Sequence, residues 1–371
     1  MKKRIHILFL SGILSFFALA WNSLAPAAVA ENPLKIGFIM VGPVADWGWN
    51  YQHDQGRLYM ESKMGDKVKT TVAENVPESA EVERVMEKMI AQGNKLIFAT
   101  SYGYLDPALR VAARHPDVII MHCGRPTPKG VKNFGSYGLD FHNHYGPQYV
   151  AGMIVGRMTK KNEIGYVAAH PVPPLLLTLN AFTLGARSVN PKVKVHVVWT
   201  NNWSDPPTEA EAAKGLIDRG VDVLAAHLDS TVTVVQTAEK NHLYSVGYHA
   251  DVHHLAPKGW LAGECWDFGP FYLDTVRSVL NHTWKPGDDS LGSKFHYGKL
   301  SVIGPVVPKS LQEQALALLR DIDGGKMVIF KGPMKDRDGR QRLAAGEVPG
   351  NDYLGKVDWL VPGIEGSVPK K

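Results

Sequence analysis

Short apolar runs alternate with helical patterns along the chain from residue 34 onward. The runs at 34–40, 96–99 and 118–121 are almost entirely apolar, which is typical of parallel strands covered on both faces. Between them, residues 79–92 place Val, Met and Ile at the spacing of a helix with one buried face, and Gly93 ends the pattern. This alternation predicts βαβ units and a parallel sheet.

The same alternation begins again after about Leu139. Apolar runs at 164–168, 193–199 and 221–226 are separated by helical patterns, and a capping box at 208–211 opens one of the helices. The repetition predicts an α/β fold with two doubly wound parallel-sheet lobes and a ligand cleft between them, at the carboxyl ends of the strands. The predicted lobes are residues 31–139 plus 258–297 and residues 140–257 plus 298–371, with crossings near Leu139, Lys258 and Tyr297.

The first thirty residues have the pattern of a secretion signal. Basic residues at 2–4 are followed by a mostly apolar stretch at 7–21 and by Ala-Val-Ala at 28–30, which is an A-x-A cleavage pattern. A membrane anchor is the alternative, but the stretch is shorter than the roughly 20 apolar residues that span a bilayer. We therefore predict a signal peptide cleaved after Ala30 and a protein that works outside the cytoplasm.

Composition and charge exclude several classes of protein. The 371 residues are 44% hydrophobic and 21% charged, values typical of an ordinary globular protein. The formal charge of +5 includes the three basic residues at 2–4, so the chain without its signal carries +2, too little for a nucleic-acid footprint. Cys123 and Cys265 could form a disulfide in an oxidising compartment or pack as inert thiols, and the sequence leaves both readings open.

No motif in the sequence marks a catalytic centre. It contains no G-x-G-x-x-G, P-loop or G-x-S-x-G. His142, His144 and the histidines at 249–254 lack a metal-ligand spacing. Residues 336–339 begin like a calcium loop but lack its bidentate Glu, and we interpret them as a hairpin turn. The sequence therefore predicts no metal, no cofactor and binding in preference to catalysis.

Two loops at the ends of predicted strands contain tryptophan residues. The loop at 41–50 contains Trp47, Trp49 and Asn50, and the loop at 200–207 contains Trp203. We expect Trp47 to pack and the other two indoles to face the cleft. Two facing aromatics form a slot for a flat ring, and offset stacking contributes about 0.5 to 1.5 kcal/mol beyond burial.

Polar residues beside these loops are candidates for the edge of such a ring. They are Asn50, Ser101, Tyr102 and Asp229, each near the carboxyl end of a predicted strand. Asp229 also precedes a predicted helix, where a carboxylate commonly caps the first turn. Either role is consistent with its position.

Several segments resemble the basic membrane protein family of ABC-transporter substrate-binding proteins, which have the type I periplasmic-binding-protein fold. The segments are 46–50, comparable to the family's D-x-S-F-N, together with 180–186, 203–206 and 247–251. The resemblance implies a monomeric protein of the periplasm that takes a small-molecule ligand to a membrane permease, with no nucleic-acid partner.

Family members that this chain resembles bind purine nucleosides, with the base between aromatics that correspond to Trp49 and Trp203 and an Asn that corresponds to Asn50. The chain departs from them where the ribose is held. His249 stands in place of an Asp, and Trp266 lies in a segment that carries a Lys in those relatives. The resemblance therefore implies a free purine base as ligand, with nucleoside binding as the alternative and a secreted nucleosidase as an alternative of another class.

Overall fold

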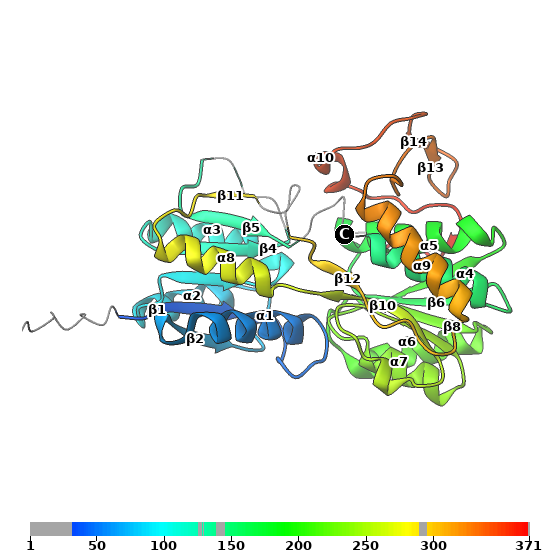
Figure 1. Cartoon of the computed structure of the whole chain (residues 1–371), viewed down its shortest axis with the longest axis horizontal. Helices are drawn as coiled ribbons and strands as arrows, with labels where there is room; N and C mark the ends of the chain where they lie inside the picture. Colours follow the sequence, from blue (N-terminus) through cyan, green and yellow to red (C-terminus); the bar gives the residue numbers. More distant parts are fainter. Residues whose placement is uncertain (1–31, 125–127, 129, 139–144, 289–294, 370–371) are drawn as a thin grey trace, which may run out of the picture. The chain divides into compact units, whose positions relative to one another are not determined.

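The computed structural model describes residues 32–124, 128, 130–138, 145–288 and 295–369. The first sheet has six strands in the order β11-β5-β4-β3-β1-β2 (Figure 1). Its strands are β1 (Leu34–Ile39), β2 (Val68–Ala73), β3 (Leu96–Ala99), β4 (Ile119–Cys123), β5 (Phe134–Tyr137) and β11 (Gly287–Asp288). Every neighbouring pair is parallel.

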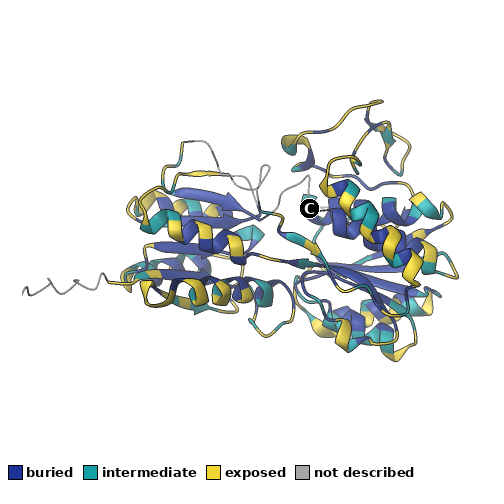
Figure 2. Ribbon diagram, viewed as in Figure 1, coloured by how far each residue is buried: buried dark blue, intermediate teal, exposed yellow. Residues whose placement is uncertain are grey.

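Helices cover both faces of this sheet. They are α1 (Trp49–Met64), α2 (Glu81–Ala91), α3 (Leu105–Arg114) and α8 (Gly269–Leu280), with the short turns η1 (Gly65–Lys67) and η2 (Tyr102–Tyr104). Consecutive residues of β1 show the two covered faces: Phe38 packs with Met60 of α1 and Tyr272 of α8, whereas Ile39 packs with Met86 of α2. The uniformly apolar runs of the sequence are explained by this double cover, and Figure 2 shows the strands buried between exposed helix faces.

The second sheet has seven strands in the order β12-β10-β9-β8-β6-β7-β15. They are β6 (Glu163–Ala168), β7 (Lys194–Trp199), β8 (Val223–His227), β9 (Tyr244–Gly247), β10 (Trp260–Trp266), β12 (Gly298–Leu300) and β15 (Ile364–Glu365). All neighbours are parallel except β12, which is antiparallel to β10. The helices of this half are α4 (Gly146–Met158), α5 (Pro173–Val189), α6 (Pro206–Asp218), α7 (Val232–Lys240), α9 (Lys309–Asp323) and the turn η3 (His253–Leu255).

We use the term first lobe for the β1 sheet with its helices and second lobe for the β6 sheet with its helices. One predicted crossing is wrong. Residues 260–266 form β10, which pairs with β9 of the second sheet, so the chain does not leave the second lobe at Lys258. It passes to the first lobe after Trp266, where α8 packs on α1, and returns to the second sheet at β12.

The chain ends on the second lobe. A hairpin of β13 (Met334–Lys335) and β14 (Gln341–Leu343) is followed by α10 (Asn351–Leu354) and by β15 at the edge of the sheet. The Asn180 side chain fixes this segment, donating to the Trp359 carbonyl at 3.0 Å and accepting from the Val361 N–H at 2.9 Å. Asp336 accepts from the N–H groups of Asp338 and Arg340 in the turn of this hairpin, which confirms the predicted hairpin turn at 336–339.

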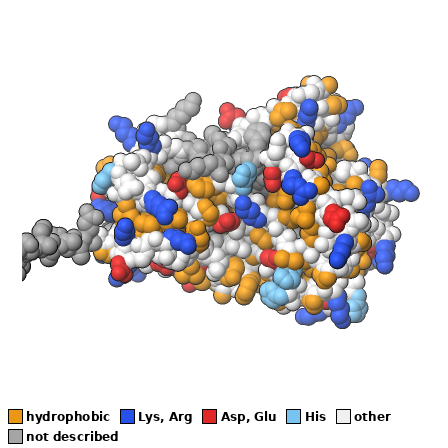
Figure 3. All heavy atoms as spheres, in the orientation of Figure 1, with side chains coloured by type: hydrophobic (Ala, Val, Ile, Leu, Met, Phe, Trp, Pro, Cys, Tyr) orange, Lys and Arg blue, Asp and Glu red, His pale blue; other side chains and the backbone are white. Residues whose placement is uncertain are grey.

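Other predictions meet the structure in part. Cys123 is buried, Cys265 is half-buried, and both are free thiols. The predicted signal peptide, Leu139, His142 and His144 lie outside the described residues. Within the described ranges, no helix has the length and apolar character to cross a membrane. On the face drawn in Figure 3, Lys and Arg are scattered among acidic and apolar side chains.

Helices α4 and α5 approach each other so closely that glycines are required between them. A Cβ at Gly185 of α5 would lie 1.9 Å from the Tyr149 carbonyl oxygen, and a Cβ at Gly152 of α4 would lie 2.0 Å from that of Phe182. Both obstructing atoms are backbone, so no side-chain rotation relieves the clash. Gly185 lies in segment 180–186, one of the segments that resemble the family, and in this structure it allows the two helices to pack closely.

We expect Gly185→Ala to lower the free energy of unfolding by about 1 to 3 kcal/mol, the usual cost of overpacking. Gly215→Ala is the matched control, because Gly215 lies on α6 with open space around it and should gain up to about 1 kcal/mol from helix propensity. Urea unfolding measures both. Equal effects of the two substitutions would contradict the close helix contact.

Candidate functional site

A cavity lies where the strand ends of both sheets meet. It contains about 480 Å³ of space outside protein atoms, part of it open to solvent, a size that suits a small ligand. Its walls are formed by Trp49, Ser101, Tyr102, Cys123, Gly124, Val172, Pro174, Trp203, His227, Asp229, Tyr248, His249 and Trp266. Each of these residues ends or follows a parallel strand, which is the position where doubly wound sheets bind ligands.

The structure brings seven of the eight candidate residues to this cavity: Trp49, Ser101, Tyr102, Trp203, Asp229, His249 and Trp266. The eighth, Asn50, is fully buried and is not part of the wall. Its amide donates to Asp46 Oδ2 at 2.7 Å and accepts from the Gly42 N–H at 3.2 Å. These bonds hold the loop before α1 in place, so Asn50 acts on the site through this loop and is not part of the wall.

Trp49 is held rigidly at the first helical position of α1. Its indole Nε1–H donates to the Thr100 carbonyl at 2.7 Å, and its ring makes edge contacts with His53, His249 and Trp266. Only 9% of the residue is exposed. Trp49 therefore contributes to the cavity wall with only a small part of its ring, because neighbouring aromatics cover the rest.

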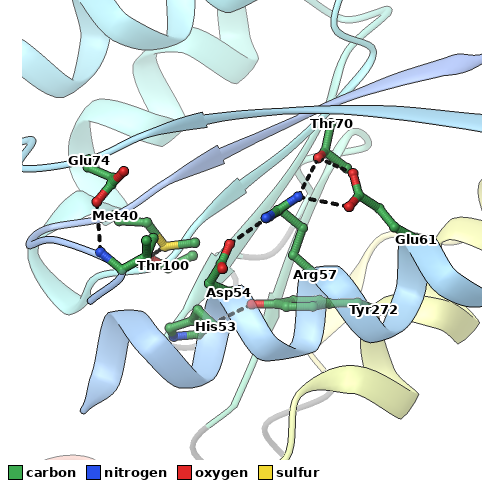
Figure 4. A network of polar contacts seen from close by, with 10 residues as sticks. Met40, His53, Asp54, Arg57, Glu61, Thr70, Glu74, Thr100 and Tyr272 are labelled. Atoms are coloured by element: carbon green, nitrogen blue, oxygen red, sulfur yellow. Dashed lines mark hydrogen bonds and ion pairs between the residues drawn. The ribbon is translucent and has the colours of Figure 1, made fainter. Parts of the chain in front are cut away.

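The helix that carries Trp49 is anchored by polar contacts to β2 and α8 (Figure 4). Arg57 reaches from α1 to Asp54 at 2.7 Å, to Glu61 at 2.9 Å and to Thr70 of β2 at 2.9 Å. His53, one turn after Trp49, is hydrogen-bonded through Nδ1 to the Tyr272 hydroxyl of α8 at 2.5 Å. Burial lowers the pKa of His53 well below its usual value, so the imidazole under Trp49 is neutral at physiological pH.

His249 and Trp266 form a bonded pair on the opposite wall. The Trp266 Nε1–H donates to His249 Nδ1 at 2.6 Å, and the Trp266 ring stacks on Phe268 with 5.5 Å between centroids. Because an indole N–H can only donate, His249 Nδ1 carries no proton. His249 has a φ of 72°, an uncommon value for a residue other than Gly, which turns its ring from the end of β9 toward the indole.

Trp203 lies on the second-lobe wall and is only half-buried. Its ring contacts His170 at 5.1 Å and His227 at 6.2 Å between centroids, and His227 in turn lies 4.0 Å from the Tyr248 ring. The second lobe thus presents a set of flat rings to the cavity. Trp47 is 43% exposed, stacks on Tyr51 and is absent from the wall.

Asp229 is a buried carboxyl group whose Oδ2 has no hydrogen-bond partner among the residues that the structure describes. Burial and the charges of Asp46 and Glu78 raise its pKa well above its usual value, against a hydrogen bond from Asn50 that lowers it. The helix-cap interpretation is wrong, because the N-cap position of α7 is Thr231, and it is the Ser230 hydroxyl that accepts from the Val232 N–H at 3.3 Å.

Six wall residues are not among the candidates from the sequence: Cys123, Gly124, Val172, Pro174, His227 and Tyr248. Four of them stand in the last position of a strand or directly after it, at Cys123, Gly124, His227 and Tyr248. That position alone was a usable signal. Burial raises the pKa of the Cys123 thiol well above its usual value, so it contributes surface to the cavity and not a nucleophile. No group of His, Cys, Asp or Glu in the described ranges is arranged to hold a metal ion.

Residues 34–328 match the family model of PnrA-like ABC transporter substrate-binding proteins. A purine-binding protein of Brucella abortus is 40% identical over 349 residues, which are 94% of this chain and 97% of that protein. A Haloferax volcanii protein named for ABC-transporter glucose binding is 33% identical over 338 residues, 91% of this chain and 81% of the other.

Solved structures share the fold at low sequence identity. An ABC-transporter solute-binding protein from Aeropyrum pernix aligns with a TM-score of 0.67 at 17% identity, covering 82% of this chain and 93% of the other. One from Conexibacter woesei aligns with a TM-score of 0.61 at 23% identity, covering 79% and 97%. The two-lobed α/β architecture is therefore that of type I periplasmic binding proteins.

Asp229→Asn removes the buried charge and keeps the side-chain shape. A carboxyl group with a raised folded-state pKa loses stability as pH rises from its unfolded pKa toward its folded one. We therefore expect the ligand-free variant to match the wild type near pH 3 and to become more stable than the wild type as the pH rises above about 4. Urea unfolding at several pH values measures this, with the exposed Asp66→Asn as control. A pH-independent difference would contradict a raised pKa for this buried carboxyl group.

Proposed function

Because the chain belongs to the family of PnrA-like ABC-transporter substrate-binding proteins, we propose that it captures a free purine base in this cavity and delivers it to a membrane permease. The role is binding and transport, and the protein works outside the cytoplasm after its signal peptide is removed. The Brucella relative named for purine binding supports the ligand class.

The observation that carries the proposal is a buried carboxyl group set among flat aromatic rings. Trp49, Trp203 and Tyr248 offer ring faces and edges, and Asp229 offers an oxygen that the described protein residues leave unpaired. A heteroaromatic ring with N–H groups along its edge satisfies both features, because stacking covers the rings and an edge N–H pairs with the carboxyl group.

The His249–Trp266 pair supports a base in preference to a nucleoside. The indole and imidazole bond to each other at 2.6 Å, so the indole N–H is not available to a sugar. Ribose hydroxyls placed against these rings would lose hydrogen bonds to water and gain few in return, which is unfavourable. The same reasoning weighs against glucose, despite the relative named for it, because each sugar hydroxyl needs a polar partner.

We expect calorimetry to show adenine, hypoxanthine or guanine binding at least about tenfold more tightly than the matching nucleoside, which is about 1.4 kcal/mol. Trp266→Ala should narrow that difference by making room for the sugar, whereas Trp266→Phe should keep most of it. Tighter nucleoside binding would restore the nucleoside alternative. Binding of glucose alone would favour a sugar carrier, and release of hypoxanthine from inosine would reveal an enzyme.

Trp203→Ala should weaken base binding by about tenfold or more, because it removes one stacking surface. The matched control is Trp284→Ala, which also removes a half-buried indole but lies outside the cavity wall.

Asp229→Asn should weaken base binding by roughly fivefold to a hundredfold, the cost of mismatching a buried donor. Unchanged affinity in either site variant would remove that residue from the ligand contact.

A further inference from the structure

The first turn of α1 distributes its main-chain N–H groups between the two lobes. A helix leaves its first N–H groups without intrahelical partners. Asp46 accepts three of those around the turn, from Gly48 at 2.7 Å, Tyr51 at 3.0 Å and Asn50 at 3.2 Å. The Trp49 N–H lies between them and is not bound by Asp46. The Trp49 N–H is therefore the donor of this turn that Asp46 leaves for another acceptor.

That donor is taken by the second lobe. The Trp49 N–H donates to the Asp229 carbonyl oxygen at 2.7 Å. Next to it, the Ser230 hydroxyl donates to the Asp46 carbonyl oxygen at 2.5 Å. Both bonds join the loop before α1 to the loop before α7, and neither involves a ligand atom or a residue side chain that lines the cavity.

Gly48 permits this contact. A Cβ at position 48 would lie 1.8 Å from the Asp229 carbonyl oxygen, 2.8 Å from the Asp229 carbonyl carbon and 2.8 Å from the Ser230 Cα. All three nearest atoms are backbone of the second lobe. A methyl group at this position is therefore incompatible with the contact between the lobes, and it would be tolerated only if the lobes separated here.

We propose that Gly48 and Ser230 set ligand affinity without touching the ligand, by forming a latch that holds the lobes closed. The latch comprises the Gly48 backbone against Asp229, the Trp49–Asp229 bond and the Ser230–Asp46 bond. For a ligand that binds only the closed form, the apparent affinity is the intrinsic affinity multiplied by the fraction of protein that is closed. A change that lowers the closed fraction therefore lowers the apparent affinity. The inference uses the proposed function only to choose the probe ligand.

The latch is tested first without any ligand, by hydrogen exchange of the Trp49 amide in the full-length mature chain. We expect that amide to exchange at least about threefold faster in Ser230→Ala than in the wild type, because losing one neutral hydrogen bond lowers the closed population. Ser278→Ala is the matched control, since its hydroxyl bonds to Thr275 within α8. If the Trp49 amide exchanges at the same rate in Ser230→Ala as in the wild type, the proposed latch is wrong, whatever the ligand is.

Adenine binding provides the second test. Gly48→Ala should weaken it by at least about tenfold, and Ser230→Ala by roughly threefold to tenfold, with urea unfolding close to wild type in both. Gly215→Ala, on an open helix surface, should bind as the wild type does. Normal adenine affinity in Gly48→Ala would overturn the latch. If the wild type binds no purine, the proposed function fails while the exchange experiment still decides the latch.

Discussion

The Asp46 carboxylate organises the site on which the rest of the structure depends. By accepting the N–H groups of Gly48, Asn50 and Tyr51, it fixes the direction in which α1 starts. That direction places the Trp49 ring against the cavity and leaves its N–H for the second lobe. Burial raises the pKa of Asp46, so the network that holds the turn is assembled around a group that water solvates poorly.

Two carboxyl groups from different lobes are brought near each other by this arrangement. Asp46 contributes to the raised pKa of Asp229, and the folded protein bears the cost of burying the Asp229 carboxyl group. Strain of this kind is characteristic of sites that bind, because a replacement that relieves it also removes the recognition group. A ligand N–H at Asp229 would relieve part of the cost, which links recognition to the stability of the closed form.

The sequence was sufficient for the βαβ rhythm, the two lobes and most of the wall, since strands, their carboxyl ends and aromatic loops are local features. It was not sufficient for Asn50, whose partners Gly42 and Asp46 are set by the folded loop. The crossing at Lys258 failed because an apolar run such as β10 does not reveal which sheet it joins. His227 and Tyr248 could have been predicted from their places at a strand end and directly after one, because residues at such positions line the cavity.

A carrier must release what it captures, and the latch limits how firmly the lobes can close. Its two cross-lobe hydrogen bonds are neutral, each with a net contribution of about 0.5 to 1.5 kcal/mol. That range shifts a closed population severalfold without fixing it. Ion pairs across the cleft at this point would oppose opening more strongly. With only a glycine, a serine and two carbonyl groups in contact, binding of the ligand or of the permease can shift the equilibrium between the open and closed forms. Reversible closure therefore follows from the modest chemistry of the residues that meet there.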